Sequence, residues 1–406
     1  MSDKVVIVGA GQAGGQTAVS LRLMGHEGPI VVIGDEAHVP YERPPLSKAF
    51  LSGDVAHERL YLKKPGYYAD HDIELKLNTR VSAIDRAAKT VALSSGESLS
   101  YDKLVLATGS RVRKLDVPGG NLPGIHYLRT LADVEAIKDS LKPGARAAIV
   151  GGGYIGLEVA AVLTKLDAKP VVIEVMDQVM ARAMAPKVAS FFEQVHRSRG
   201  VDIRLKTGVT GFEAGADGRV AAAITNTGEK IPADLAIIGI GILPQVELAA
   251  EAGLKVDNGI AVDEYGRTED PAVFAAGDCT NHPNALLDRR LRLESVQNAV
   301  SQGKAVAGAI VGKPAPYAEV PWFWSDQFDL KLQIVGLSDP TDEVVIRGSL
   351  EEHKFSACYL RGGELVAINC INASRDFNAA KKLIAAHARP DPIKLADPDI
   401  ALKEFE

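Results

Sequence analysis

The hydrophobic positions of the chain follow the same pattern in two separate segments. Residues 5–35 read VVIVGAGQAGGQTAVSLRLMGHEGPIVVIGD, and residues 147–174 read AAIVGGGYIGLEVAAVLTKLDAKPVVIE. In each, a short apolar run leads into a glycine-rich turn, a stretch with helical spacing follows, and a second apolar run ends in an acidic residue. The pattern predicts two strand–helix–strand units of an α/β fold with parallel strands.

Both turns have the spacing G-x-G-x-x-G. Their glycines are Gly9, Gly11 and Gly14 in the first unit and Gly151, Gly153 and Gly156 in the second. The first glycine permits the tight turn, the second lets backbone approach a pyrophosphate, and the third lets helix and strand pack closely. The N-terminus of the following helix then offers free N–H groups to the phosphates. Because each copy follows a strand and opens a helix, the sequence predicts two bound dinucleotides.

The acidic residues that end the two units, Asp35 and Glu174, are expected to bind ribose hydroxyls. A carboxylate at this position accepts hydrogen bonds from the ribose and repels a 2′-phosphate, whereas NADP sites usually place an arginine nearby. Glu174 therefore favours NADH over NADPH, although Arg182 could fold back toward it. In the first unit, Glu36 competes with Asp35 for the ribose role.

The helix expected after the second turn carries an apolar stripe. Ile155, Val159, Val162 and Leu166 recur at helical spacing, and Leu163 widens the stripe. Such a stripe is typical of a helix that lies on a sheet.

Composition and charge limit the remaining possibilities. At roughly 150 residues per domain, the 406 residues correspond to two or three domains, and 46% hydrophobic and 24% charged residues are ordinary for a globular protein. The net charge of −6 does not favour nucleic acid or an anionic membrane as a partner. The start of the sequence lacks the pattern of a signal peptide, so we expect none, and no apolar run reaches the roughly 20 residues that a membrane helix needs. We expect a soluble, cytoplasmic protein that binds no membrane.

Cysteine and histidine spacing argues against thiol and metal chemistry. Cys279, Cys358 and Cys370 are too few for a disulfide framework and form no C-x-x-C pair. The nine histidines are scattered without metal-ligand spacing. We expect no metal site.

Five further segments, together with the glycine motifs, resemble the FAD- and NADH-dependent ferredoxin reductases of bacterial oxygenase systems. These segments are 41–48 (YERPPLSK), 104–109 (LVLATG), 239–244 (GIGILP), 268–278 (ending FAAGD) and 321–327 (PWFWSDQ). The match runs from the first strand to about Gly336 and more loosely to the C-terminus. The resemblance implies FAD and NADH as cofactors.

The resemblance also implies a glutathione-reductase-like α/β flavoprotein with two dinucleotide-binding domains and a C-terminal α+β domain. The FAD-binding domain would comprise residues 1–112 and 243–321, and the NAD-binding domain, 113–242, would be inserted into it. The C-terminal domain, 322–406, would cover the far side of the flavin. Prolines and glycines at 118–124 fit the first crossing between domains.

Cofactor-binding residues follow from the same resemblance. The FAD contacts carried over position by position are Ala13, Asp35, Lys48, Val81, Arg129, Asp278 and Val296. The shared motifs add Arg43, Ala107, Thr108, Gly109, Gly241, Gly277 and Trp324, and the second glycine motif adds Tyr154 and Ile155.

Three of these positions have an ordinary structural alternative. Asp278 would accept a bond from a ribityl hydroxyl, or it could cap a turn. The helix that opens at Ser295 would direct its N-terminal dipole at the flavin, or it could be an ordinary amphipathic helix. Tyr154 would gate the flavin face, or it could simply pack.

Lys48 and Glu158 are the candidate catalytic residues. The resemblance implies that they form an ion pair beside flavin N5, which orients groups rather than transferring a proton. Without the resemblance, each residue would more often be a solvated charge. Hydride transfer itself requires mainly alignment and exclusion of water.

The electron acceptor is expected to be a 2Fe–2S ferredoxin. Disulfide reductases of this fold use cysteines near the flavin, but residues 35–60 contain none, which excludes a thiol relay there. Because such ferredoxins are acidic, Arg289, Arg290 and Arg292 are the candidate docking residues, with Arg375, Lys381 and Lys382 as a second group. Trp322 and Trp324 would line the flavin edge or pack in the core.

Other acceptors remain open at this stage. The alternatives are a rubredoxin reductase, an NADH oxidase or monodehydroascorbate-like reductase, and a signalling flavoprotein resembling apoptosis-inducing factor. The lack of a targeting sequence and of basic DNA-binding character argues against the last of these.

Overall fold

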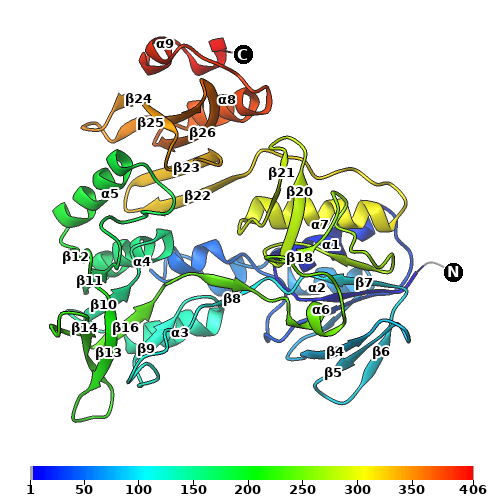
Figure 1. Ribbon diagram of the computed structural model, residues 1–406. Helices are drawn as coiled ribbons and strands as arrows, with labels where there is room; N and C mark the ends of the chain where they lie inside the picture. Colours follow the sequence, from blue (N-terminus) through cyan, green and yellow to red (C-terminus); the bar gives the residue numbers. More distant parts are fainter. Residues whose placement is uncertain (1–2, 406) are drawn as a thin grey trace. The chain divides into compact units, whose positions relative to one another are not determined.

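The computed structural model describes residues 3–405 and divides into two compact units (Figure 1). The first unit comprises Met1–Arg43, His57–Arg111 and Leu243–Pro321. The second comprises Pro44–Ala56, Val112–Ile242 and Trp322–Glu406. Two of the passages of the main chain between the units lie within β8 (Ser110–Val112) and β17 (Ile242–Pro244), and the others follow Arg43, Ala56 and Pro321.

A five-stranded parallel sheet forms the centre of the first unit. Its strands, in spatial order, are β19 (Val273–Ala275), β7 (Lys103–Leu106), β1 (Val5–Val8), β2 (Ile30–Ile33) and β3 (Ile73–Lys76). The strand β1, the helix α1 (Gln12–Leu23) and the strand β2 are the first strand–helix–strand unit that the sequence predicts.

The two faces of this sheet pack against different partners because successive side chains of a strand point to opposite sides. Val5 and Ile7 pack with α1, α2 (Pro65–Asp70) and α7 (Val296–Ile310), and α1 and α7 lie side by side (Figure 1). Val6 and Val8 pack with the other layer. That layer contains α6 (Glu247–Glu251) and the antiparallel strands β4 (Val81–Asp85), β5 (Thr90–Leu93) and β6 (Ser98–Ser100).

Short elements complete the first unit. They are the 3₁₀ turn η2 (His57–Arg59) and the strands β18 (Ile260–Ala261), β20 (Thr280–Asn284) and β21 (Arg289–Leu291).

The second unit repeats the parallel arrangement. Its central sheet has the order β12 (Asp202–Arg204), β11 (Lys169–Ile173), β10 (Arg146–Val150), β16 (Leu235–Ile238) and β9 (Ile125–Tyr127). The helices are α3 (Leu131–Ser140), α4 (Tyr154–Lys165) and α5 (Pro186–Ser198), and the 3₁₀ turn η1 (Pro44–Ser47) contacts α3 and α4. The antiparallel strands are β13 (Val209–Ala214), β14 (Val220–Thr225) and β15 (Lys230–Pro232). The second predicted strand–helix–strand unit is thus confirmed as β10, α4 and β11.

One detail of the predicted α4 stripe is wrong. Val159 and Leu163 are fully buried, but Ile155 is 44% exposed. Ile155 stands in the first turn of α4, before the buried positions of the helix begin at Gly156, so helical spacing alone does not bury it.

The last part of the second unit is an antiparallel sheet with helices. Its strand order is β22 (Trp322–Gln327), β23 (Leu330–Gly336), β26 (Glu364–Ile371), β25 (Lys354–Arg361) and β24 (Glu343–Ser349). The helix α8 (Ser374–Ala385) contacts β23 and β26, and α9 (Pro392–Ala396) contacts β24. The 3₁₀ turn η3 (Leu402–Phe405) contacts α8. The expected C-terminal α+β character is confirmed.

Candidate functional site

The glycines of the first motif are required for different reasons. Gly9 has φ +113°, and a Cβ on Gly14 would lie 1.9 Å from the Gly9 carbonyl oxygen. The chain itself therefore needs both glycines. A Cβ on Gly11 would meet nothing within 4 Å. That open space at the start of α1 fits the close approach of a dinucleotide pyrophosphate.

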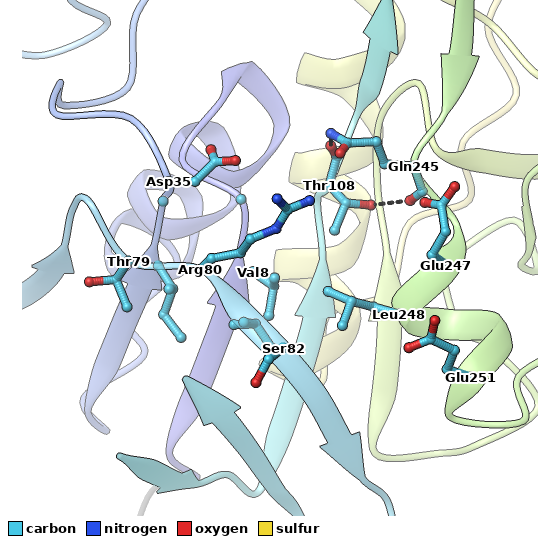
Figure 2. A pocket seen from close by; sticks show the side chains of 14 residues that line it. Val8, Asp35, Thr79, Arg80, Ser82, Thr108, Gln245, Glu247, Leu248 and Glu251 are labelled. Atoms are coloured by element: carbon cyan, nitrogen blue, oxygen red, sulfur yellow. Dashed lines mark hydrogen bonds between the residues drawn. The ribbon is translucent and has the colours of Figure 1, made fainter. Parts of the chain in front are cut away.

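A cavity of ≈ 320 Å³ lies beside this turn (Figure 2). Asp35 and Arg80 line one side, and Gln245, Glu247 and Glu251 line the other. Its remaining walls include Gly9, Val81 and Thr108. The cavity brings together four of the predicted cofactor-binding positions, namely Gly9, Asp35, Val81 and Thr108.

Asp35 and Glu36, which competed for the ribose role, have different environments. The Glu36 carboxylate accepts hydrogen bonds from the Tyr41 hydroxyl and from Arg43, both at 2.6 Å. Asp35 instead lines the cavity. Glu36 is thus engaged by neighbouring side chains, and Asp35 is the acidic residue positioned for a ligand.

Side-chain hydrogen bonds hold the loops of the first unit. The Thr108 hydroxyl donates to the Gln245 carbonyl at 2.6 Å (Figure 2), and the Gln245 amide donates to the Thr108 carbonyl at 2.8 Å. The Ser110 hydroxyl donates to Asp278 at 2.8 Å, and the backbone N–H of Gly277 donates to Gln302 at 2.6 Å. These bonds orient the two loops that carry Thr108, Gly109, Gly277 and Asp278.

The second glycine motif repeats the geometry of the first. Gly151 has φ +109°, and a Cβ on Gly156 would lie 2.0 Å from the Gly151 carbonyl oxygen. A Cβ on Gly153 would meet nothing within 4 Å. The second unit therefore offers its own open turn at the start of α4.

Glu174 lies close to this turn. One oxygen of its carboxylate accepts the Gly152 N–H at 2.6 Å, and the other accepts the Met176 N–H at 2.9 Å. Arg182 is exposed. The backbone thus fixes the orientation of the carboxylate before any ligand binds.

Lys48 and Glu158 form the ion pair that the resemblance implies. Lys48 Nζ lies 2.8 Å from Glu158 Oε2, and the Ser47 hydroxyl donates to the same oxygen at 2.5 Å. The Ser325 hydroxyl donates to Oε1 at 2.6 Å. The carboxylate is only 2% exposed. Three donors, from η1, from Lys48 directly after it and from β22, therefore contact one buried carboxylate of α4.

Tyr154 lies at the start of α4 and packs edge-on against Phe323, with ring centroids 5.0 Å apart. Its hydroxyl is buried and has no hydrogen-bond partner among residues 3–405. Burial raises the pKa of Tyr154 above its usual value. The side chain is therefore neutral, with one buried polar atom available to a ligand.

The other predicted residues are distributed over both units. Ala13, Arg43, Ala107, Gly109, Gly277, Asp278 and Val296 belong to the first unit. Arg129, Gly241 and Trp324 belong to the second, as do Lys48 and Ile155. The Arg129 backbone N–H donates to Asp133 at 2.9 Å, and the Trp324 ring lies 5.9 Å from that of Trp322.

The predicted docking arginines are not equally available. Arg290 donates to the carbonyls of Val262 and Asn281 at 2.8 and 2.5 Å, and Arg292 pairs with Glu294. Arg289 is exposed. In the second basic group, Lys381 lies over the rings of Trp322 and Phe377, at 4.2 and 4.1 Å.

Sequence reasoning missed Ser47, Ser325 and Gln245. Ser47 lies within the YERPPLSK segment, and Ser325 alternates with Trp322 and Trp324 along one strand. That alternation was the available signal for Ser325, because it predicts that tryptophans and serine point to opposite faces. Gln245 has no comparable signal.

Comparison with known proteins decides the family. Residues 3–303 match the pyridine nucleotide-disulphide oxidoreductase family, and residues 322–406 match the reductase C-terminal family. The chain belongs to the pyridine nucleotide-disulphide oxidoreductases. Membership confirms the predicted α/β fold and oxidoreductase class and implies FAD and NAD(H) as cofactors.

Similar members of the family are ferredoxin reductases. Rhodocoxin reductase of Rhodococcus erythropolis is 46% identical over 98% of this chain and 93% of that protein. Putidaredoxin reductase CamA of Pseudomonas putida is 44% identical over 100% and 97%. The crystal structure of the covalent putidaredoxin reductase–putidaredoxin complex matches with a TM-score of 0.96 and 44% identity, over 99% and 98% of the two chains. The resemblance to ferredoxin reductases is confirmed.

The cysteines of this family member are not placed for disulphide chemistry. Cys279, Cys358 and Cys370 are free and buried. Burial raises the pKa of all three thiols, which disfavours the reactive thiolate. Residues 3–405 hold no cluster of His, Cys, Asp and Glu that could bind a metal, and no helix among them is long and apolar enough to cross a membrane.

Proposed function

We propose that the chain is an NADH-dependent ferredoxin reductase that transfers electrons to a 2Fe–2S ferredoxin of an oxygenase system. The observation that carries the proposal is the presence of two open glycine turns, at Gly11 and Gly153, on a chain whose thiols are all buried. The names of the similar ferredoxin reductases support the same acceptor. FAD, when bound, accepts a hydride from NADH and releases the electrons singly.

The FAD-binding residues of the proposal lie around the first glycine turn. Gly11 leaves room for the pyrophosphate, Asp35 would bind the ribose, and Val81 lines the same cavity. Asp278, oriented by the Ser110 hydroxyl, would accept a hydrogen bond from a ribityl hydroxyl of the flavin. The start of α7 at Val296 directs its dipole at the flavin, which favours negative charge there.

The NADH-binding residues lie around the second turn. Gly153 leaves room for the pyrophosphate, and the oriented Glu174 carboxylate accepts the ribose hydroxyls and repels a 2′-phosphate. Tyr154, which packs against Phe323 at the start of α4, would gate the flavin face. The Lys48–Glu158 pair orients this region and transfers no proton.

The partner surface in this proposal includes Arg289, Arg290 and Arg292. Arg289 is the member best placed for an acidic ferredoxin, because internal bonds engage the other two guanidinium groups. Arg375, Lys381 and Lys382 are the second docking candidate, and Lys381 lies over the ring of Trp322. Electrostatic docking raises the association rate and weakens as salt increases.

The domain boundaries and the location also belong to the proposal. We assign residues 1–112 and 243–321 to FAD, 113–242 to NADH and 322–406 to the C-terminal domain. Three free cysteines suit a cytoplasmic location, where thiols stay reduced.

Acceptor assays of the purified holoprotein test the proposal. With NADH as donor, we expect faster reduction of a 2Fe–2S ferredoxin than of rubredoxin or oxygen. Iodoacetamide treatment of the folded protein should leave the ferredoxin rate unchanged, because the thiols are buried. Preferred turnover with rubredoxin or oxygen, or loss of activity on alkylation, contradicts the proposal.

A further inference from the structure

The two faces of strand β22 have different contacts. Phe323, Ser325 and Gln327 alternate with Trp322, Trp324 and Asp326 along the strand. Phe323 packs on Tyr154, Ser325 donates to Glu158, and Gln327 accepts from His196. One face of β22 therefore contacts α4 and α5, which belong to the proposed NADH-binding part of the chain.

A directed chain of hydrogen bonds runs along this face. His196 Nε2 lies 2.9 Å from Gln327 Oε1, and Gln327 Nε2 donates to Ser325 Oγ at 3.2 Å. Ser325 Oγ then donates to Glu158 Oε1 at 2.6 Å. The direction is determined because an ionised carboxylate can only accept, so each group upstream must donate toward it.

Burial makes this chain hard to replace by water. Ser325, Gln327 and His196 have no exposed surface, and Glu158 has 2%. Burial lowers the pKa of His196 to about 4, so the ring is neutral at physiological pH. A neutral imidazole has one N–H, and that proton must be on Nε2 for the bond to Gln327. Nδ1 has no hydrogen-bond partner among the described residues.

We propose that Ser325 and Gln327 are positioning residues that hold the Glu158 carboxylate toward Lys48, so that the C-terminal domain helps to set the rate of hydride transfer from NADH. This inference rests on the proposed function. The opposite Glu158 oxygen accepts from Ser47 and Lys48. Loss of the Ser325 bond frees the carboxylate to rotate away from that alignment.

The chain offers a matched control. Ser356 is also a fully buried serine of the same antiparallel sheet, and its hydroxyl donates to the Asp376 carboxylate at 2.8 Å. Ser325→Ala and Ser356→Ala each remove one hydrogen bond from a buried serine to a carboxylate, which is 2% exposed for Glu158 and 17% exposed for Asp376. A purely structural role predicts similar effects of the two substitutions on activity.

Stopped-flow reduction of the bound flavin by NADH, in the holoprotein, compares the variants. We expect S325A to slow this step about tenfold, as for loss of one hydrogen bond to a charged group, and S356A to leave it within about twofold. Ser325→Thr, which keeps the hydroxyl, should restore most of the rate. Gln327→Met should give a smaller loss than S325A, because Gln327 acts through Ser325.

A double-mutant cycle tests whether Ser325 acts through Glu158. In a Glu158→Ala background, S325A should cause no further loss. Independent of turnover, ¹⁵N NMR should find the His196 proton on Nε2. Equal rates for S325A and S356A, full additivity in the cycle, or a proton on Nδ1 overturns the inference. If E158A alone has no effect on the rate, the proposed role of the Lys48–Glu158 pair fails instead.

Discussion

Lys48 and Glu158 are 110 residues apart in sequence, yet Lys48 Nζ lies 2.8 Å from Glu158 Oε2. The pair is buried on the carboxylate side, where Glu158 is 2% exposed, and only the lysine reaches solvent, with 16% exposure. An exposed ion pair contributes little to stability, whereas removal of one partner from a buried pair leaves an uncompensated charge.

Lys48→Met should therefore slow the reduction of flavin by NADH. We expect a loss of about tenfold or more in the stopped-flow rate, since the Glu158 carboxylate keeps its serine donors but loses the lysine that is its charged partner. Lys165→Met is the control, because Lys165 pairs with Asp54 at 2.6 Å on the exposed surface of the same unit. Equal rates in the two variants would show that the buried pair has no part in the reaction.

Substitutions at two glycines of the second motif should have different effects, one on stability and the other on NADH binding. Gly156→Ala places a Cβ 2.0 Å from the Gly151 carbonyl oxygen, so we expect a loss of stability of about 1–3 kcal/mol or failure to fold. Gly153→Ala meets no atom of the chain and should leave the melting temperature unchanged.

The same Gly153→Ala variant should raise KM for NADH about tenfold, because the methyl group occupies the space reserved for the pyrophosphate. Its FAD content should stay normal, which absorbance at the flavin band measures. Unchanged NADH kinetics would place the nucleotide elsewhere.

Replacement of Glu174 should weaken the discrimination against NADPH. Glu174→Ala removes the carboxylate whose oxygens accept the Gly152 and Met176 N–H groups. Because charge repulsion at a distance of a few ångströms contributes over 1 kcal/mol, we expect the ratio of kcat/KM for NADH over NADPH to fall about tenfold.

Asp177→Ala is the control for this ratio, since Asp177 is an exposed acidic residue only three positions away. A ratio that falls equally in both variants would mean that general surface charge, and not the oriented Glu174 carboxylate, selects the cofactor.

Two buried histidines should make stability depend on pH. Burial lowers the pKa values of His196 and His282 to about 4 from the ordinary 6.5. Between pH 6.5 and about 4 the unfolded state binds protons that the folded state does not, so the free energy of unfolding falls as the pH falls. At pH 5 the loss is about 2 kcal/mol per histidine.

Melting temperatures of the holoprotein at pH 7.5 and pH 5 measure this effect. The His196→Gln/His282→Phe variant should lose less stability on acidification than the wild type. His387→Gln, which replaces an exposed histidine, should behave like the wild type. An equal decrease in all three proteins would assign the acid sensitivity to other groups.

The sequence by itself determined the two nucleotide-binding turns, because their requirements are local. Gly9 and Gly151 need positive φ angles, and Gly14 and Gly156 need the absence of a Cβ within the same turn. These constraints involve residues at most five positions apart. The structure adds a distant one, because a Cβ on Gly9 or Gly151 would also meet the carbonyl oxygen of Ala107 or Gly239, at 2.1 and 2.4 Å. The short apolar runs that form the central strands, such as β1 and β2, are likewise visible in the local sequence.

Only the tertiary structure decided which side chains meet. Glu158 receives donors from η1 and β22, segments more than 100 residues away on either side. The tertiary structure also shows that Ile155 is exposed, that Glu36 accepts a hydrogen bond from Arg43, and that Arg290 donates to a backbone carbonyl. Backbone geometry is restricted mainly by near neighbours in the chain. Contacts between side chains of distant elements depend instead on how those elements pack, and the spacing of residues along the sequence does not reveal that packing.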